Sequence, residues 1–317
     1  MQLDSEKINR IKTHMKLMIS RDDINKLFLS WFGGEPLLSF DIVLEITQWA
    51  SNLAKNLNKQ FSATITTNGT LLTPKRILAL KDAGVGHYQI TIDGDKDTHD
   101  KTKVLGKLSA YATTLANVSE IIKHTPVSLR FNYTKTNLIP QKIIEDLDKF
   151  LSKQNREKIR LLLFKVWQED VDAIDDAKIE NLIKRALSIG IVPRVADVGM
   201  CYADQFNFDC IFSNGYVGKC DNHNPYSMKG EIDSEGYITW KRETQSFKPV
   251  LEQKDNECLR CNYLPICFGP CPSKRERMLN DSGNISCQFN DKHKFATNMV
   301  RNKHINKLLE QASFQSY

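Results

Sequence analysis

The positions of the cysteines are the strongest constraint that this sequence sets. All eight lie between Cys201 and Cys287, and the first 200 residues contain none. The opening stretch, residues 1–16, is polar and charged and lacks the apolar core of a secretory signal. We therefore expect a cytoplasmic protein, in which thiols stay reduced. Clustered cysteines in such a protein bind a metal centre more often than they form disulfides.

The spacing of these cysteines favours iron–sulfur clusters. The pattern reads C-x13-G-x4-C, a gap, C-x2-C-x5-C-x3-C, a second gap and a last cysteine, and an eighth cysteine lies inside the first part. Structural zinc usually needs two separated pairs, whereas eight thiolates are the complement for two four-iron clusters. Zinc, disulfides and unliganded buried cysteines remain as alternatives. The candidate metal ligands are Cys201, Cys210, Cys220, Cys258, Cys261, Cys267, Cys271 and Cys287.

The first two thirds of the chain alternate between short apolar runs and amphipathic segments, which is typical of a parallel α/β fold. The predicted strands are 27–32, 63–66, 88–92, 128–133 and 159–167. The predicted helices are 40–56, 74–83, 109–123, 140–152 and 175–188. Five such repeats predict a TIM-like barrel or partial barrel, with functional groups on the loops that follow the strands.

The two ends of the chain depart from this alternation. An amphipathic segment, 7–19, precedes the first predicted strand, so we expect a partial (β/α) barrel that lacks its first strand. Beyond residue 191 the pattern predicts short hairpins at 211–219 and 230–241 and a closing helix at 291–311. We therefore predict two domains, an incomplete barrel at 1–190 and a small cysteine-rich domain at 191–317.

Composition narrows the classes of partner. The hydrophobic fraction of 41% and the charged fraction of 26% are those of a globular protein. No apolar run approaches the roughly 20 residues that span a bilayer. The net charge of +6 is spread along the chain and forms no basic block. So mild an excess suits an acidic small molecule or peptide as easily as a nucleic acid, and it decides little. Our expectation for the partner is neither a membrane nor a nucleic acid.

The cysteine pattern resembles the SPASM domain of radical S-adenosylmethionine (SAM) enzymes, whose seven cysteines and one glycine are all matched between Cys201 and Cys287. The eighth, Cys210, is similar to an extra ligand found in some members. The resemblance implies two auxiliary 4Fe-4S clusters. It assigns the first to Cys201, Cys210, Cys220 and Cys271, and the second to Cys258, Cys261, Cys267 and Cys287.

The loops of the predicted barrel resemble the SAM-binding loops of the same superfamily. The segment 30–37, SWFGGEPL, is similar to its second-strand motif, and 67–69 and 91–94 are similar to the loops after the next two strands. Glycines let the backbone approach a ligand closely, and 91–94 with the following His99-Asp100 is similar to the ribose region. Many members carry an arginine where Lys103 stands, which keeps the charge but loses the bidentate geometry. The residues that the resemblance assigns to SAM are Gly33, Gly34, Glu35, Asn68, Thr91, Asp93, Lys103 and Asn132.

One element of the superfamily has no counterpart in these 317 residues. Radical SAM enzymes carry a CxxxCxxC loop whose iron–sulfur cluster cleaves SAM to a 5′-deoxyadenosyl radical, and this sequence has no cysteine before Cys201. We expect an N-terminally truncated record, with the loss of SAM cleavage as the alternative. The chain as printed is not expected to generate the radical.

The SPASM resemblance implies a peptide maturase, or an enzyme like the anaerobic sulfatase maturases, that abstracts hydrogen from a peptide or protein. It also implies a reductant such as flavodoxin or ferredoxin. Asp221 stands where sulfatase-maturating members place a general base, and a solvated loop aspartate is the competing interpretation. The alternative functions are a non-catalytic iron–sulfur protein that binds a peptide or relays electrons, and a zinc-stabilised interaction module.

Overall fold

The structure is a computed structural model that describes residues 3–166, 176–195, 200–221, 230–240, 248–253, 256–289 and 291–314. The chain divides into two compact units, one of residues 25–196 and 304–317 and one of residues 1–24 and 197–303. The domain boundary that we predicted at residue 190 lies close to residue 196, where the first segment of the larger unit ends. The opening helix, which we placed with the barrel, groups with the cysteine-rich unit.

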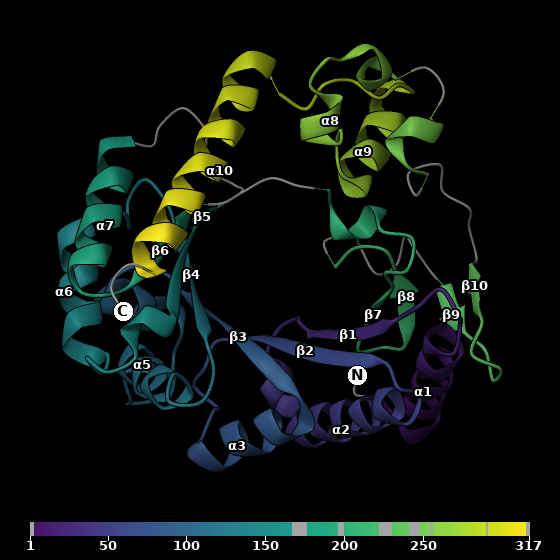
Figure 1. Ribbon diagram of the computed structural model, residues 1–317, viewed down its shortest axis with the longest axis horizontal. Coiled ribbons are helices and arrows are strands. Elements are labelled where there is room, and N and C mark those ends of the chain that lie inside the picture. The colour runs from purple at the N-terminus through teal and green to yellow at the C-terminus, as the bar shows by residue number, and fades with distance from the viewer. Residues whose placement is uncertain are drawn as a thin grey trace. The chain divides into compact units, whose positions relative to one another are not determined.

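The larger unit is built on a six-stranded parallel sheet in the order β1-β2-β3-β4-β5-β6 (Figure 1). Its strands are β1 (Lys26–Trp31), β2 (Gln60–Thr67), β3 (Val85–Ile92), β4 (Val127–Tyr133), β5 (Ile159–Lys165) and β6 (Val192–Val195). This confirms the α/β class and the partial-barrel arrangement of the first five strands. The sequence analysis did not predict β6, because in this four-residue strand, which contains Pro193 and Arg194, apolar and polar side chains do not alternate clearly. Trp167, the predicted end of β5, lies outside the described residues.

Helices follow the strands and lie along one side of the sheet (Figure 1). They are α2 (Phe40–Asn56), α3 (Pro74–Ala83), α4 (Lys96–Thr102), α5 (Ala110–Ile121), α6 (Pro140–Phe150) and α7 (Asp176–Ser188). The bounds of α2 and α3 were predicted to the residue. Sequence reading missed α4, because its seven polar residues show no helical spacing of apolar side chains. Position 175, the predicted start of α7, lies outside the described residues.

Local signals explain why α3 begins and ends where it does. The Thr73 side chain accepts a hydrogen bond from the backbone N–H of Arg76, and Pro74 occupies the first turn, where its missing N–H costs nothing. Gly84 ends the helix at φ +106°, a left-handed conformation. A Cβ at Gly84 would lie 2.7 Å from the Phe61 ring, so the site also excludes any larger residue.

The two faces of the sheet differ in chemistry, which places the candidate site. Side chains such as Ile65, Ile90 and Leu129 are fully buried in the core against the helices. On β2, β3 and β4 the alternate residues are mostly polar, and Gln89 donates to the Thr66 hydroxyl at 3.3 Å. Because side chains alternate along a strand, one face forms the core and the other offers polar groups to a ligand.

The smaller unit contains a four-stranded antiparallel sheet in the order β10-β9-β8-β7. The strands are β7 (Cys210–Ile211), β8 (Tyr216–Gly218), β9 (Gly230–Ile232) and β10 (Ile238–Trp240), so the two predicted hairpins join into one sheet. Position 241, the predicted end of the second hairpin, lies outside the described residues. The unit also holds α1 (Ser5–Ile19), α8 (Leu264–Cys267), α9 (Pro272–Ser282) and the first part of α10 (Lys292–Phe314). Among the described residues, no helix is both long and apolar enough to cross a membrane.

A buried histidine ties α1 to this small sheet. The His14 side chain is 6% exposed; its Nδ1 lies 2.8 Å from the Gly236 carbonyl and its Nε2 lies 3.4 Å from the Asp209 carboxylate. Burial alone lowers the pKa of His14, but the bonds to Asp209 and Gly236 outweigh it and raise the pKa above its usual value. Both ring nitrogens face acceptors, so the imidazolium fits this position.

We predict that this contact makes stability depend on pH. A folded-state pKa above the unfolded value of about 6.5 means that the contribution of His14 is complete below that pH and is lost as pH rises through the folded pKa. The urea midpoint of the wild-type protein should therefore fall between about pH 6 and pH 9 more steeply than that of His14→Gln, which cannot titrate. Parallel pH profiles for the two proteins would contradict this role.

Candidate functional site

The residues assigned to SAM gather at the carboxyl ends of the first four strands of the parallel sheet. Gly33 and Gly34 follow β1, Asn68 follows β2, Asp93 follows β3 and Asn132 lies near the end of β4. Both glycines are exposed, and a Cβ built on either would meet nothing within 4 Å. Gly33 has φ +139°, which favours glycine. Open backbone at this edge fits the close approach of a ligand.

Glu35 joins the first two loops of this edge. Its Oε1 accepts from the Thr67 hydroxyl at 2.7 Å and from the backbone N–H of Leu37 at 3.1 Å. Its Oε2 accepts from the backbone N–H of Asn68 at 2.8 Å. The carboxylate therefore holds the β1 loop against the β2 loop, a positioning role that the sequence did not reveal. Asn68 in turn accepts from the backbone N–H and hydroxyl of Thr70 at 2.9 and 2.7 Å.

Asp93, in the loop after β3, connects this loop to the end of β4. Its Oδ1 accepts from the Asn132 side-chain amide at 3.0 Å, and its Oδ2 lies 3.6 Å from Lys103 Nζ. Arg130 Nε donates to Asn132 Oδ1 at 3.1 Å, so the amide is held from both sides. Thr91 is half-buried on β3, on the opposite face from the core residues of that strand. The structure thus brings Asp93, Lys103 and Asn132 into one polar group.

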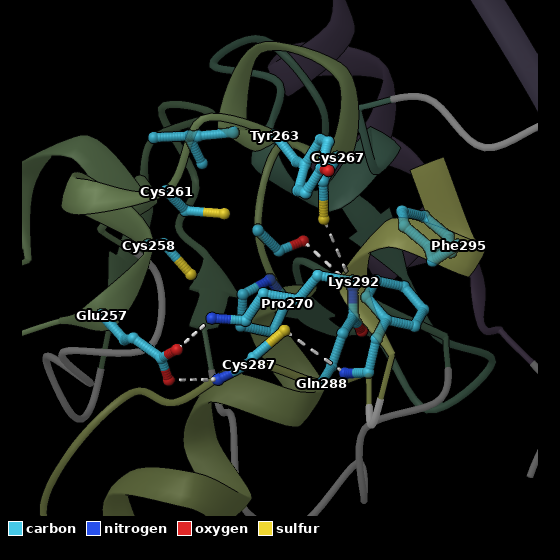
Figure 2. Close-up of a pocket in the computed structure, with 13 residues that line it drawn as sticks. Glu257, Cys258, Cys261, Tyr263, Cys267, Pro270, Cys287, Gln288, Lys292 and Phe295 are labelled. Atoms are coloured by element: carbon cyan, nitrogen blue, oxygen red, sulfur yellow. Dashed lines mark hydrogen bonds and ion pairs between the residues drawn. The ribbon is translucent and has the colours of Figure 1, made fainter. Parts of the chain in front are cut away.

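Four of the cysteines line one pocket in the cysteine-rich unit. Figure 2 shows Cys258, Cys261, Cys267 and Cys287 with their sulfur atoms directed toward a common space. The pocket holds about 400 Å³ of space, part of it open to solvent. These are the four residues that the resemblance assigned to the second cluster. Burial, followed by the nearby Cys267, Cys287 and Cys261, raises the pKa of the Cys258 thiol to about 11.

Polar groups that the sequence reading missed surround this pocket. The Gln288 side-chain amide donates to Cys267 Sγ at 3.9 Å, and the backbone N–H of Phe289 donates to Cys287 Sγ at 3.5 Å. Lys292 pairs with Glu257 (Figure 2). Donors in these positions can hydrogen-bond to sulfur atoms that hold a cluster. In the sequence, the one feature that could have pointed to Gln288 and Lys292 as pocket residues is that both follow Cys287 within five positions.

Among the other four cysteines, Cys271 and Cys220 affect the pKa of Cys201, and Cys220 affects the pKa of Cys210. Burial raises the pKa of Cys201, with smaller contributions from Cys271 and Cys220, and burial with Asp221 and Cys220 raises the pKa of Cys210 to about 12. All eight cysteines are free thiols. Four thiols are the number that one 4Fe-4S cluster needs, so the residue types fit such a cluster. In the described part of the chain, no group of three or more His, Cys, Asp or Glu side chains is arranged to hold a metal ion.

Asp221 is exposed and lies beside the first set of thiols. It accepts from the Tyr202 hydroxyl, and Cys220 Sγ lies 3.8 Å from its Oδ1. Burial, followed by the bond to Asp221, raises the pKa of Tyr202 well above its usual range, so the phenol keeps its proton. The carboxylate can accept a proton there, and its catalytic role stays a prediction.

Comparison with known proteins connects this geometry to a family. Residues 4–160 match the Radical SAM superfamily. The chain therefore contains a Radical SAM superfamily domain. This family implies SAM and an iron–sulfur cluster as cofactors, and the loops at the carboxyl edge of β1–β4 belong to the matched region.

Proteins similar to the chain in sequence include two from Methanosarcina barkeri (strain Fusaro / DSM 804). The chain is 35% identical over 118 residues to its AdoMet-dependent heme synthase, which covers 36% of this chain and 31% of the relative. It is 29% identical over 133 residues to its Fe-coproporphyrin III synthase, covering 42% and 30%. The chain thus aligns with less than a third of the length of either relative.

Solved structures resemble this chain over more residues than the Radical SAM match covers. Native anSMEcpe with bound AdoMet and Kp18Cys peptide is 13% identical and has a TM-score of 0.57, over 99% of this chain and 91% of that one. Streptococcus suis SuiB bound to the precursor peptide SuiA is 14% identical and has a TM-score of 0.52, over 86% and 66%. At these identities the likeness concerns the fold alone.

Proposed function

We propose that the chain supplies the SAM-binding partial barrel and a twin-cluster SPASM domain of a radical SAM enzyme that modifies a peptide or protein. The observation that carries the proposal is that Cys258, Cys261, Cys267 and Cys287 line one pocket, with their sulfur atoms toward a common space (Figure 2). The remaining four cysteines, Cys201, Cys210, Cys220 and Cys271, make up the other set that the family resemblance implies. Each set offers the four thiolates that one 4Fe-4S cluster needs. In this function the clusters carry electrons or bind the substrate.

The barrel residues bind and orient SAM in this proposal. The backbone carbonyls at Gly33 and Gly34 would accept hydrogen bonds from the ammonium of the methionine moiety beside Glu35, and Asn68 and Thr91 would line the same edge. Asp93 would face the ribose with the support of Asn132. Lys103, which lies 3.6 Å from Asp93 in the structure, would pair with the SAM carboxylate. When bound beside its own cluster, SAM supplies hydrogen-atom abstraction. The 317 residues contain no cysteine ahead of Cys201 to hold that cluster.

The substrate class is proposed to be a peptide. The fold likeness to anSMEcpe and SuiB, both solved with a peptide bound, supports this choice, whereas the relatives matched by sequence are named for heme chemistry. When a Cβ hydrogen atom has been abstracted from a Ser or Cys side chain, Asp221 would take the hydroxyl or thiol proton and an auxiliary cluster would accept the remaining electron. A flavodoxin or ferredoxin would supply the electrons.

A second candidate function is a non-catalytic iron–sulfur protein that binds a peptide or relays electrons. The observation that favours it is the lack of a CxxxCxxC loop within the printed residues. A 5′-deoxyadenosine assay separates the two, because only an enzyme that cleaves SAM forms that product.

Iron analysis tests the cluster assignment. Anaerobic reconstitution should give about eight irons per chain with visible absorbance. Cys258→Ala removes a ligand from the pocket set, and Cys201→Ala removes one from the other set. Each should lower the iron content to about four, and the double variant should hold almost none.

Tyr263→Phe is the matched control, because Tyr263 lines the same pocket without a thiol and bonds to His293 at its rim. It should keep the full iron content. A colourless wild-type protein that holds zinc would contradict the proposal, and so would a Cys258→Ala variant that keeps all its iron.

A further inference from the structure

His99 is fully buried on α4 and bonds directly to the backbone of Asp93. Its exposed fraction is 0%, and its Nδ1 lies 3.2 Å from the backbone nitrogen of Asp93. A backbone N–H can only donate, so Nδ1 is the acceptor and the ring proton sits on Nε2. Burial lowers the pKa of His99, so the neutral ring that this bond needs is the stable form.

The bond falls at a point where the chain leaves the sheet. Asp93 directly follows β3, and Gly94 then turns at φ +102°, where a Cβ would lie 2.9 Å from Thr98. Beyond the strand the Asp93 N–H needs a partner outside the ladder. His99 provides that partner, while Asn132 and Lys103 hold the carboxylate of the same residue.

The helix that carries His99 is fixed at both ends. Asp95 caps its start by accepting from the Thr98 N–H at 2.8 Å. Asp100 accepts from the Tyr111 N–H at 2.8 Å and from the Ser109 hydroxyl at 2.7 Å, which joins α4 to the start of α5. His99 is therefore a rigid support and not a side chain free to follow the loop.

Packing alone gives no reason for an imidazole at this position. His99 Nε2 and the Tyr111 hydroxyl are buried without a hydrogen-bond partner among the described residues, and their rings meet edge to face with centroids 5.6 Å apart. A buried unpaired donor costs free energy that an apolar side chain of similar size would not. An apolar residue could replace the packing of the ring, but it could not accept the hydrogen bond from the Asp93 backbone N–H as Nδ1 does.

We propose that His99 is the positioning residue of Asp93, and that it sets the affinity for the ribose of SAM by fixing where that carboxylate points. The inference rests on the proposed SAM site. The charged groups that face the ring are Asp93, Asp100 and Lys103, and Tyr111 closes its other side.

The test compares two variants in the full chain by calorimetric titration with S-adenosylhomocysteine. His99→Leu keeps the apolar packing but removes the acceptor, and should weaken binding about tenfold, or about 1.4 kcal/mol. His99→Asn places an amide oxygen near the position of Nδ1 and should restore binding to within about threefold. Hydrogen exchange should show faster exchange of the Asp93 amide in His99→Leu and near wild-type protection in His99→Asn.

Tyr111→Phe is the matched control, because it changes the neighbour of the ring and leaves the bond to Asp93 intact. It should bind like the wild-type protein. Equal affinity and equal amide protection in His99→Leu and the wild-type protein would overturn the inference while the SAM site stands. A wild-type protein that does not bind S-adenosylhomocysteine would overturn the proposed SAM site, and the inference with it.

Discussion

Replacing Asp204 by alanine is expected to lower the free energy of unfolding of the cysteine-rich unit by about 3–5 kcal/mol, the cost of breaking a buried ion pair from one side. Arg275, its partner on α9, is 0% exposed, and the two side chains make paired bonds of 3.0 and 2.5 Å. The variant removes the Asp204 carboxylate and leaves a buried guanidinium whose other bonds include one to the neutral Pro270 carbonyl at 2.8 Å. At a typical slope of about 1–3 kcal/mol per molar urea, the urea midpoint should fall by about 1 M or more.

The same variant should affect the first set of cysteines specifically. Asp204 ends the short turn Tyr202–Asp204 that follows Cys201, and Arg275 lies in the first turns of the helix that follows Cys271. The pair therefore joins the two segments that carry these cysteines. Its loss should lower the iron content from about eight to about four and leave the cluster of the Cys258 pocket in place.

Asp148→Ala is the matched control for Asp204→Ala. Asp148 pairs with the buried Arg156 in the other compact unit, but its side chain is 44% exposed and Arg156 also donates to the carbonyls of Ser152, Leu151 and Ile189. We expect a smaller loss of stability and no change in iron. If Asp204→Ala keeps all of its iron and its urea midpoint, the pair does not support the cluster site.

Local signals in the sequence predicted the elements of the barrel well. Thr73, Pro74 and Gly84 fixed both ends of α3 because a cap, a first-turn proline and a left-handed glycine each act within a few residues. The carboxyl-edge loops followed from the same reasoning, since parallel strands bring their ends together. The division of the cysteines came from a family resemblance, and the structure places the four residues 258, 261, 267 and 287 around one pocket.

Long-range contacts could not be predicted in the same way. The amphipathic pattern of α1 shows that one face is buried, but not what covers it, and the bond between His14 and Asp209 joins residues far apart in the chain. Arg275 and Asp204 are 71 residues apart, and neither position carries a local signal. Glu35 was assigned to SAM from its motif, whereas its bonds to the β2 loop depend on strand pairing that only the fold establishes.

Replacing Glu35 by alanine is expected to weaken binding of S-adenosylhomocysteine by about tenfold to a hundredfold, or about 1.4–2.8 kcal/mol. The carboxylate accepts three hydrogen bonds that align the loops after β1 and β2. Bonds to a charged group contribute about 1.5–3 kcal/mol each, so their loss frees the glycine loop and the Asn68 loop to move apart. Calorimetric titration measures the affinity directly.

Two further variants separate positioning from charge. Glu35→Gln keeps an oxygen for Thr67 and Leu37 but replaces the acceptor of the Asn68 N–H with an amide nitrogen, so its affinity should fall between those of Glu35→Ala and the wild-type protein. Asp41→Ala removes an exposed carboxylate from the first turn of α2 and should bind like the wild-type protein. If Glu35→Ala binds as tightly as Asp41→Ala, the edge of β1 and β2 does not form part of the SAM site. A fall of equal size in Glu35→Ala and Glu35→Gln would instead point to the bond with Asn68 as the contact that matters most, because that is the acceptor that both variants lose.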